Sequence, residues 1–211
     1  MKTLRQNTRR TVAGLLARIA ATVAALLLAA PQAVAQAGSI STDILGWADF
    51  ATMNISASAS LSRHLSAGIS AAWNPWTFPK GESVIYNRTR TAALDLRWWS
   101  WYVQSGWWLG TGLQIKEYSE GGIGNIRAEE GLAYGGGLSV GYSKMVARWW
   151  NVELSAGLWA GRRRFCTMES VPCGRMEGPF HCFFVAPYNV AVSLVHVIPL
   201  RDAGEERRRT R

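Results

Sequence analysis

Three cysteines lie close together near the end of the chain, and thiols in that arrangement can form a disulfide or bind a metal. Cys166 and Cys173 bracket the segment CTMESVPC, and they would close a short disulfide ring in an oxidising compartment. Pairing of Cys166 with Cys182 is the rival arrangement, and the spacing alone leaves both open. His181 lies beside Cys182, but the paired CxxC spacing of a zinc site is absent. We therefore expect a disulfide between Cys166 and Cys173 and no metal site.

The chain has three histidines, which are His64, His181 and His196. A serine, a histidine and an acid on a small barrel could hydrolyse the acyl chains of lipids, and this is one hypothesis for the function. No serine is surrounded by a nucleophile motif, so the competing hypothesis places the histidines at turns and strand ends without a catalytic role. We therefore expect no enzyme activity and no cofactor.

Charged side chains inside otherwise apolar segments form the third group of candidates. Asp95, Arg97, Lys116 and Glu153 are expected to point into the interior of a narrow barrel. Buried opposite charges must pair, because an unpaired buried charge is costly, and the expected role of this group is therefore structural. A path for protons or ions through the interior is the alternative.

Four further residues are candidates for contacts at the surface. Arg162, Arg163 and Arg164 are expected in a long basic loop that continues to about Cys182, where they would engage anionic surface lipid or polysaccharide. Trp76 is expected in another loop, where its ring could stack on a sugar. A protected loop that binds no partner is the alternative.

These candidates must be positioned by strands, because the chain alternates between two kinds of side chain. Over residues 107–116 and again over 132–143, apolar and aromatic residues fall on one face, and mostly small or polar residues fall on the other. Successive side chains of a strand point to opposite faces. The small face lacks the bulk of a soluble protein's core, but it suits the interior of a membrane barrel whose apolar face contacts lipid.

The whole pattern predicts an all-β fold, an eight-stranded antiparallel up-and-down transmembrane β-barrel. Long connections follow the third, fifth and seventh strands, so they share one rim, as in outer-membrane barrels. A soluble, lipocalin-like periplasmic binder is the alternative, and it would need its bulky face inside and a polar face outside. The expected strands are 41–47, 54–61, 65–73, 88–99, 107–116, 132–143, 150–161 and 184–198.

The two ends of the chain carry most of its net charge of +9. Residues 1–36 hold five basic residues and no acid, and residues 200–211 hold five basic and three acidic residues. The remaining 13 basic and 11 acidic residues do not favour binding to nucleic acid. A basic start, a short apolar stretch and a small-residue cleavage site predict a secretory signal peptide over 1–35. The expected domains are this signal peptide, an outer-membrane barrel over 36–199 and a charged periplasmic tail over 200–211.

Several segments, taken in order along the chain, are shared with a known family. They are Trp73 to Phe78, Leu96 to Trp99, Gly106 to Gly112, Tyr118, Gly121 to Ile123, Cys166, Cys173 with Gly174, and Ala191 to Val195. With these segments the chain resembles a Bacteroidota outer-membrane β-barrel family catalogued as domain of unknown function family 3575. The resemblance implies a small outer-membrane barrel with no established activity and no catalytic residue. A bacterial outer-membrane location makes membrane lipid the expected partner, with surface polysaccharide or another envelope protein as further candidates.

Overall fold

The computed structural model describes residues 37–49, 51–80, 83–121, 127–169 and 176–199. The predicted signal peptide and charged tail lie outside the described residues, so both stay predictions. Among the residues described, no helix is long and apolar enough to cross a membrane. The elements are β1 (Ala37–Asp43), α2 (Ile44–Ala48), β2 (Met53–Ser60), β3 (Leu65–Asn74), β4 (Thr77–Lys80), β5 (Ser83–Trp99), β6 (Gly106–Gly121), β7 (Arg127–Ala147), β8 (Trp150–Glu169) and β9 (Met176–Pro199).

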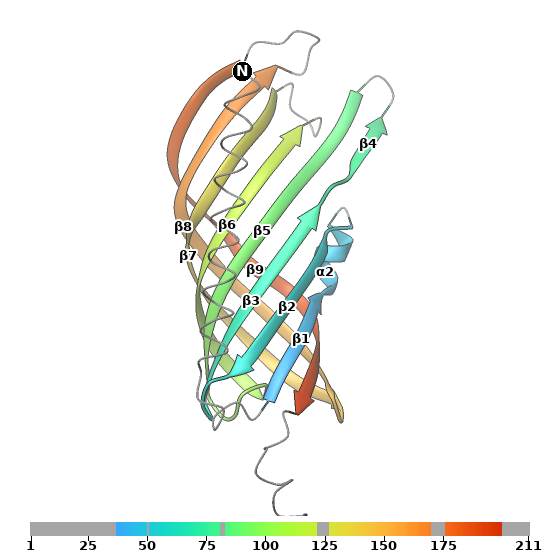
Figure 1. Ribbon diagram of the computed structural model, residues 1–211, viewed down its shortest axis with the longest axis vertical. Helices are drawn as coiled ribbons and strands as arrows, with labels where there is room; N and C mark the ends of the chain where they lie inside the picture. Colours follow the sequence, from blue (N-terminus) through green and yellow to red (C-terminus); the bar gives the residue numbers. More distant parts are fainter. Residues whose placement is uncertain (1–36, 50, 81–82, 122–126, 170–175, 200–211) are drawn as a thin grey trace, which may run out of the picture. The chain divides into compact units, whose positions relative to one another are not determined.

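Eight of the strands close into one barrel, shown in Figure 1. Hydrogen-bonded neighbours follow the order β3-β2-β1-β9-β8-β7-β6-β5-β4, and an additional pairing of β3 with β5 closes the ring. β4 is a short extra strand that pairs with β5. The pairs around the ring are antiparallel. The predicted eight-stranded antiparallel up-and-down barrel is confirmed.

The strands end at nearly the same level at one end of the barrel and at different levels at the other. At one end, short connections join β2 to β3, β5 to β6 and β7 to β8, and we call this the turn end. At the other end, β6 to β9 continue well beyond β1, β2 and β3 (Figure 1). We call it the long-strand end. The pairing of β1 with β9 stops at Asp43 and Ser193, so the upper part of β9 continues past β1.

Side chains alternate between the two faces of the barrel as the sequence predicts. Leu113, Leu138 and Leu158 point outward and are 66%, 71% and 62% exposed. Ser139 and Ser155 point inward and are buried. The bulky face therefore lies outside and the small face inside, and the predicted register of these strands is confirmed.

Two tryptophans fill the interior toward the turn end. Trp99 and Trp108 are almost completely buried, and their ring centroids are 6.1 Å apart. Trp99 Nε1 donates a hydrogen bond to Ser66 Oγ at 2.9 Å. A Cβ atom added to Gly141 would lie 2.5 Å from the Trp108 ring, so only glycine leaves room for that ring. The small residues of the inner face thus accommodate a few large rings.

The first strand begins and ends earlier than predicted. The expected strand over 41–47 is wrong, because β1 ends at Asp43 and the short helix α2 follows. The Asp43 side chain accepts hydrogen bonds from the backbone N–H groups of Leu45 and Gly46. An aspartate in this position caps a helix start, which is the local reason for the change of structure.

The strands extend further at the long-strand end than predicted. The expected loop over 162–182 is mostly strand, because β8 continues to Glu169 and β9 begins at Met176. The loop expected over 117–130 is shortened in the same way by β6 and β7. Backbone pairing maintains a strand whatever its side chains are, so the apolar alternation ends before the strand does.

A β-bulge in β9 changes which of its residues face the interior. Ser155 and Gly157 of β8 pair with Ala191 and Tyr188 of β9, which leaves one extra residue in β9. The simple alternation predicts Tyr188 and Val190 on one outward face. Instead Tyr188 is 7% exposed in the interior, whereas Val190 is 58% exposed. An extra residue shifts the alternation by one, and this is why the predicted face of Tyr188 is wrong.

Candidate functional site

Three of the four charged residues predicted for the interior contact one another there. Arg97 Nε donates to Asp95 Oδ2 at 2.8 Å, and Arg97 Nη1 donates to Glu153 Oε1 at 2.8 Å. Asp95 and Arg97 share the inner face of β5, whereas Glu153 lies on β8, with β6 and β7 between them in the sheet. Arg97 therefore bridges the interior from one wall to another.

The bridge is largely shielded from solvent. The side chains of Arg97, Asp95 and Glu153 are 15%, 13% and 4% exposed. The Arg97 Cζ atom also lies 4.5 Å from the centroid of the Trp108 ring, a favourable cation–π distance. Among the described residues, the second oxygen of Glu153, Oε2, has no hydrogen-bond partner. One guanidinium thus compensates two carboxylates, and the group forms a structural cross-brace.

Lys116, the fourth predicted member, lies elsewhere along the barrel. Its Nζ atom is 3.7 Å from Glu120 Oε1 and 5.9 Å from the centroid of the Tyr118 ring. In the β5–β6 register, Lys116 pairs with Thr91 and not with a neighbour of Arg97. Alternation assigns a residue to the inner face, but its position along the barrel follows only from the strand register.

Gln104, from the turn between β5 and β6, closes the interior at the turn end. It is 8% exposed and adopts a positive φ of 69°. Its Nε2 atom donates to Ser39 Oγ at 2.9 Å and to Ser58 Oγ at 3.2 Å. Its backbone oxygen accepts from Asn151 Nδ2 at 2.7 Å and from Ser143 Oγ at 3.3 Å. A single turn residue thereby connects β1, β2, β7 and β8, and nothing in our sequence analysis singled it out.

A second polar cluster lies inside the barrel toward the long-strand end. Tyr118 Oη donates to Glu129 Oε1 at 2.6 Å, and Arg163 Nη1 lies 3.2 Å from the same oxygen. Arg163 Nε donates to Cys182 Sγ at 2.9 Å. The Arg163 guanidinium also stacks over the Phe165 ring at 4.6 Å. This cluster joins side chains from β6, β7, β8 and β9.

Apolar rings fill the interior between the two polar clusters. Trp159 and Tyr188 are buried there in one group with Tyr118 and Ala133. The Phe184 ring packs edge-on against Trp159, with 4.5 Å between their centroids. The described interior is therefore occupied by side chains over most of its length.

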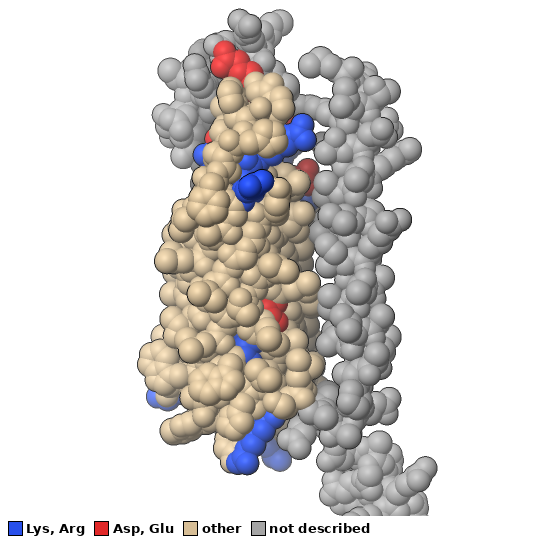
Figure 2. All heavy atoms as spheres, turned by 90° about the vertical axis from the view of Figure 1, so that its left-hand side faces the viewer, with Lys and Arg blue, Asp and Glu red and all other residues tan. Residues whose placement is uncertain are grey.

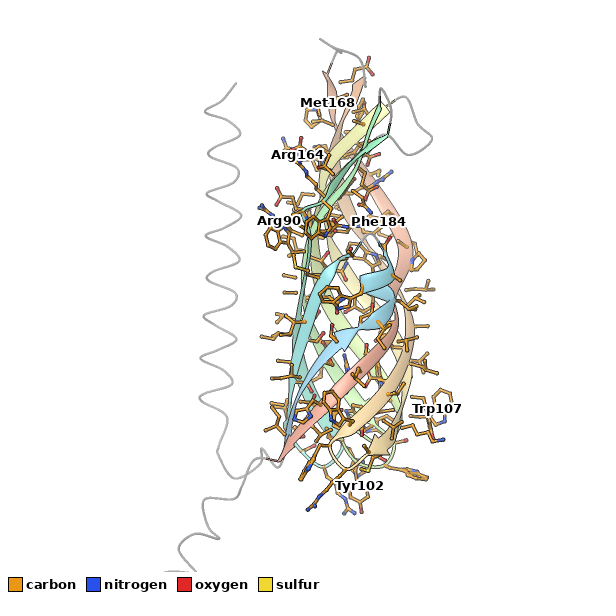
Figure 3. The ribbon with its side chains drawn as sticks, turned by 90° about the vertical axis from the view of Figure 1, so that its right-hand side faces the viewer. Arg90, Tyr102, Trp107, Arg164, Met168 and Phe184 are labelled. Atoms are coloured by element: carbon orange, nitrogen blue, oxygen red, sulfur yellow. The ribbon has the colours of Figure 1, made fainter. Side chains whose placement is uncertain are left out.

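The three consecutive arginines do not act as one surface group. Arg163 points inward, as its contacts with Glu129 and Cys182 require. Arg162 and Arg164 are exposed on the outer face of β8, and Figure 3 shows Arg164 projecting away from the ribbon. Their predicted place in a common loop is wrong, because β8 includes all three and the strand alternation separates them.

The cysteines do not form a disulfide in the described structure. Cys166 and Cys182 are free thiols, and Cys173, the expected partner of Cys166, lies outside the described residues. The expected bond between Cys166 and Cys173 is therefore not found. Cys166 pairs with Glu130 across the β7–β8 ladder, on the outward side, whereas Cys182 contacts Arg163 inside. The rival pairing of Cys166 with Cys182 is excluded by these opposite directions.

The remaining candidates lie at strand ends and on the outer surface. Trp76 is 45% exposed, and its Nε1 atom donates to the backbone oxygen of Ala51 at 3.1 Å. His64 Nδ1 lies 3.0 Å from the backbone oxygen of Trp99 at the turn end. The His196 ring packs at a tilt of 51° against Trp150, with 4.7 Å between the ring centroids. His181 is exposed on the upper part of β9.

Ion pairs connect the walls of the barrel, and side chains occupy most of its described interior. Within the described ranges, no group of three or more His, Cys, Asp or Glu residues could hold a metal ion. No curated protein matches the chain. A family model described as Protein of unknown function (DUF3575) matches residues 21–198. The chain belongs to this family, as the resemblance of its sequence led us to expect.

Proposed function

We propose that the protein is a small β-barrel of the bacterial outer membrane, with a structural or surface-interaction role in the envelope and no catalytic activity. The observation that carries this proposal is an apolar belt on the outside of the barrel. A soluble, lipocalin-like binder would carry its bulky side chains inside, around a ligand. The belt includes Ile55, Ile69, Leu96, Leu109, Leu113, Leu138, Val140, Leu154 and Leu158, each more than a third exposed.

The belt ends sharply toward the long-strand end. On β5 the outward series passes from Ala92 to Arg90, and on β8 it passes from Ala160 to Arg162. Glu117 is the outward residue of β6 that pairs with Arg90. A change from apolar to charged residues on neighbouring strands is expected where a membrane barrel leaves the lipid. The face in Figure 2 agrees with this, since its middle is mostly uncharged and Lys and Arg gather toward its ends.

Aromatic residues mark the opposite boundary, at the turn end. Trp98 and Trp107 are 50% and 61% exposed there, and Trp107 packs edge-on against Tyr142 at 5.1 Å. Lys144 and Arg148, which are exposed, follow these aromatic residues toward the tip of the turn end. Tryptophan and tyrosine are enriched where a membrane meets water, because their rings are apolar and carry a polar tip.

The length of the belt fits a bilayer. The outward series, which is apolar apart from Thr111, covers residues 107–115 on β6 and 152–160 on β8. A tilted strand needs about 9–11 residues to cross the hydrocarbon core.

In outer-membrane barrels the longer extensions face the outside of the cell. We therefore orient the long-strand end toward the exterior and the turn end toward the periplasm.

One substitution pair tests this proposal. Leu138→Arg places a cation in the belt, where it costs about 2–4 kcal/mol near the bilayer midplane. Ser119→Arg adds the same charge on the outward face of β6, just above the belt, and is the matched control. We expect the wild type and Ser119→Arg in the membrane fraction after an alkaline wash, and much less Leu138→Arg.

Two results would contradict the proposal. The first is recovery of the mature wild-type protein from the soluble periplasm without detergent. The second is equal membrane assembly of Leu138→Arg and Ser119→Arg, since lipid would then not contact Leu138.

A further inference from the structure

We propose that Arg162 and Arg164 form a binding site for the phosphate headgroups of membrane lipid at the upper edge of the belt. This inference rests on the proposed membrane location and adds a partner to it. The ligand class is a lipid with an anionic phosphate headgroup, held with its acyl chains against the belt and its phosphate against the two guanidinium groups.

The two arginines are held side by side by the strand. Both lie on the outer face of β8, two residues apart, which separates their Cα atoms by about 6.6–6.8 Å. Arg162 pairs across the ladders with Tyr134 of β7 and Phe183 of β9, and Arg164 pairs with Leu132 and His181. Because β8 is paired on both sides at this level, the two side chains start from a rigid surface and not from a loop.

Neither arginine is neutralised by a partner among the described residues. The two strands that pair with β8, which are β7 and β9, are both described at this level, and no acidic group there forms an ion pair with Arg162 or Arg164. Other arginines of the barrel are engaged: Arg163 with Glu129, and Arg90 with Glu117. The nearest outward acids are Glu130 on β7 and Glu117 on β6, one strand further away. Glu130 pairs with Cys166, further toward the strand ends, and Glu117 is engaged by Arg90.

Their position selects a lipid phosphate over a dissolved anion. Ala160, directly below Arg162 on the same face, is the last residue of the apolar series on β8. Tyr134 and Phe183, which flank Arg162 in the ladder, are 51% and 69% exposed and present rings to the same zone. A headgroup phosphate lies at this depth when its acyl chains cover the belt. The planar guanidinium donates two parallel hydrogen bonds to phosphate, which a lysine ammonium does not reproduce.

The barrel offers a matched control on another strand. Arg88 and Arg90 also lie two residues apart on an outer face at the upper edge of the belt. Arg88 Nη2 and Nε donate to Thr77 Oγ1 at 2.9 and 3.1 Å, and Arg90 Nη1 lies 3.9 Å from Glu117 Oε2. These two arginines already have partners, so they should contribute less to binding.

The test compares the full chain in detergent micelles with the variants Arg162→Gln/Arg164→Gln and Arg88→Gln/Arg90→Gln. Native mass spectrometry measures bound phosphatidic acid, bound diacylglycerol with the same acyl chains, and displacement by inorganic phosphate. We expect the wild type to prefer phosphatidic acid by about tenfold, which corresponds to about 1.4 kcal/mol. The Arg162/Arg164 variant should lose most of this preference, and the Arg88/Arg90 variant should keep it.

Three outcomes overturn the inference: no preference in the wild type, an equal loss in both variants, or full displacement by inorganic phosphate at the same concentration as the lipid. Insertion of each protein into phosphatidylcholine vesicles is measured separately. A wild type that does not insert contradicts the proposed membrane location. Proteins that insert equally but show no preference contradict only the phosphate site.

Discussion

Replacement of Arg97 by methionine should destabilise the barrel strongly. The change removes the guanidinium that pairs with Asp95 and Glu153 at 2.8 Å each, and it keeps a flexible side chain beside Trp108. Two carboxylates would then remain in the interior with little solvent, since their side chains are 13% and 4% exposed. Breaking a buried ion pair by removing one partner costs about 3–5 kcal/mol. The loss of the cation–π contact adds about 0.5–2 kcal/mol.

A triple variant separates the charge effect from the loss of packing. Arg97→Met combined with Asp95→Asn and Glu153→Gln removes all three charges at nearly constant volume. Replacement of a complete buried ion group is often close to neutral, so the triple variant should recover at least about 2 kcal/mol relative to Arg97→Met alone. If Arg97 acted only by filling space, the two additional substitutions would not restore stability.

The assay is equilibrium unfolding by urea of the chain folded in detergent micelles. Tryptophan fluorescence and far-ultraviolet circular dichroism follow the same transition and report its midpoint. A loss below about 1 kcal/mol for Arg97→Met would refute the reasoning, since that is the range of solvent-exposed ion pairs. A triple variant no more stable than Arg97→Met would show that packing, and not charge, explains the loss.

Three further predictions follow from single contacts. Asn151→Leu removes the side chain that donates to the Gln104 backbone oxygen at 2.7 Å, and it should lower the free energy of unfolding in urea by about 1–3 kcal/mol. Val152→Leu changes the neighbouring outward residue and should cost less. Equal losses in the two variants would contradict the role of Gln104. Gly141→Ala places a methyl 2.5 Å from the Trp108 ring and should cost at least about 1–3 kcal/mol. Gly136→Ala on the same strand meets its first atom at 3.4 Å and should stay within about 0.5 kcal/mol of the wild type, and a reversed order would refute the assigned faces. Arg163→Gln should lower the unfolding midpoint, because Arg163 lies in the interior cluster, while Arg162→Gln should leave that midpoint unchanged.

The barrel itself could be predicted from the sequence because its two faces differ in chemistry over long stretches. Leu138 and Ser139 are adjacent, yet one is 71% exposed and the other 9% exposed, as the alternation requires. The inward direction of Asp95, Arg97 and Glu153 followed from the same pattern. Their mutual contact needed more, because β5 and β8 are brought together only when the sheet closes.

Other features have no signal in the side-chain pattern. The bulge before Ala191 is one extra residue in β9 relative to β8, and it reversed the predicted face of Tyr188. Gln104 lies in the turn over residues 100–105, and nothing in the local sequence distinguishes it from a solvated turn residue. The strands beyond the belt were missed because their pairing depends on backbone hydrogen bonds, while the prediction depended on apolar side chains.

The run Arg162-Arg163-Arg164 shows how backbone conformation decides what a charge can do. In a loop, three adjacent arginines would be equivalent members of one basic patch. In β8 the pleat turns the middle one into the interior, where Glu129 and Cys182 hold it, and leaves the outer two on the face that adjoins the belt. One short segment therefore supplies a structural residue and two candidate lipid contacts. Carboxylates hold the interior Arg97 and Arg163, whereas Arg162 and Arg164, which the strand alternation places outside, form no ion pair within the described residues.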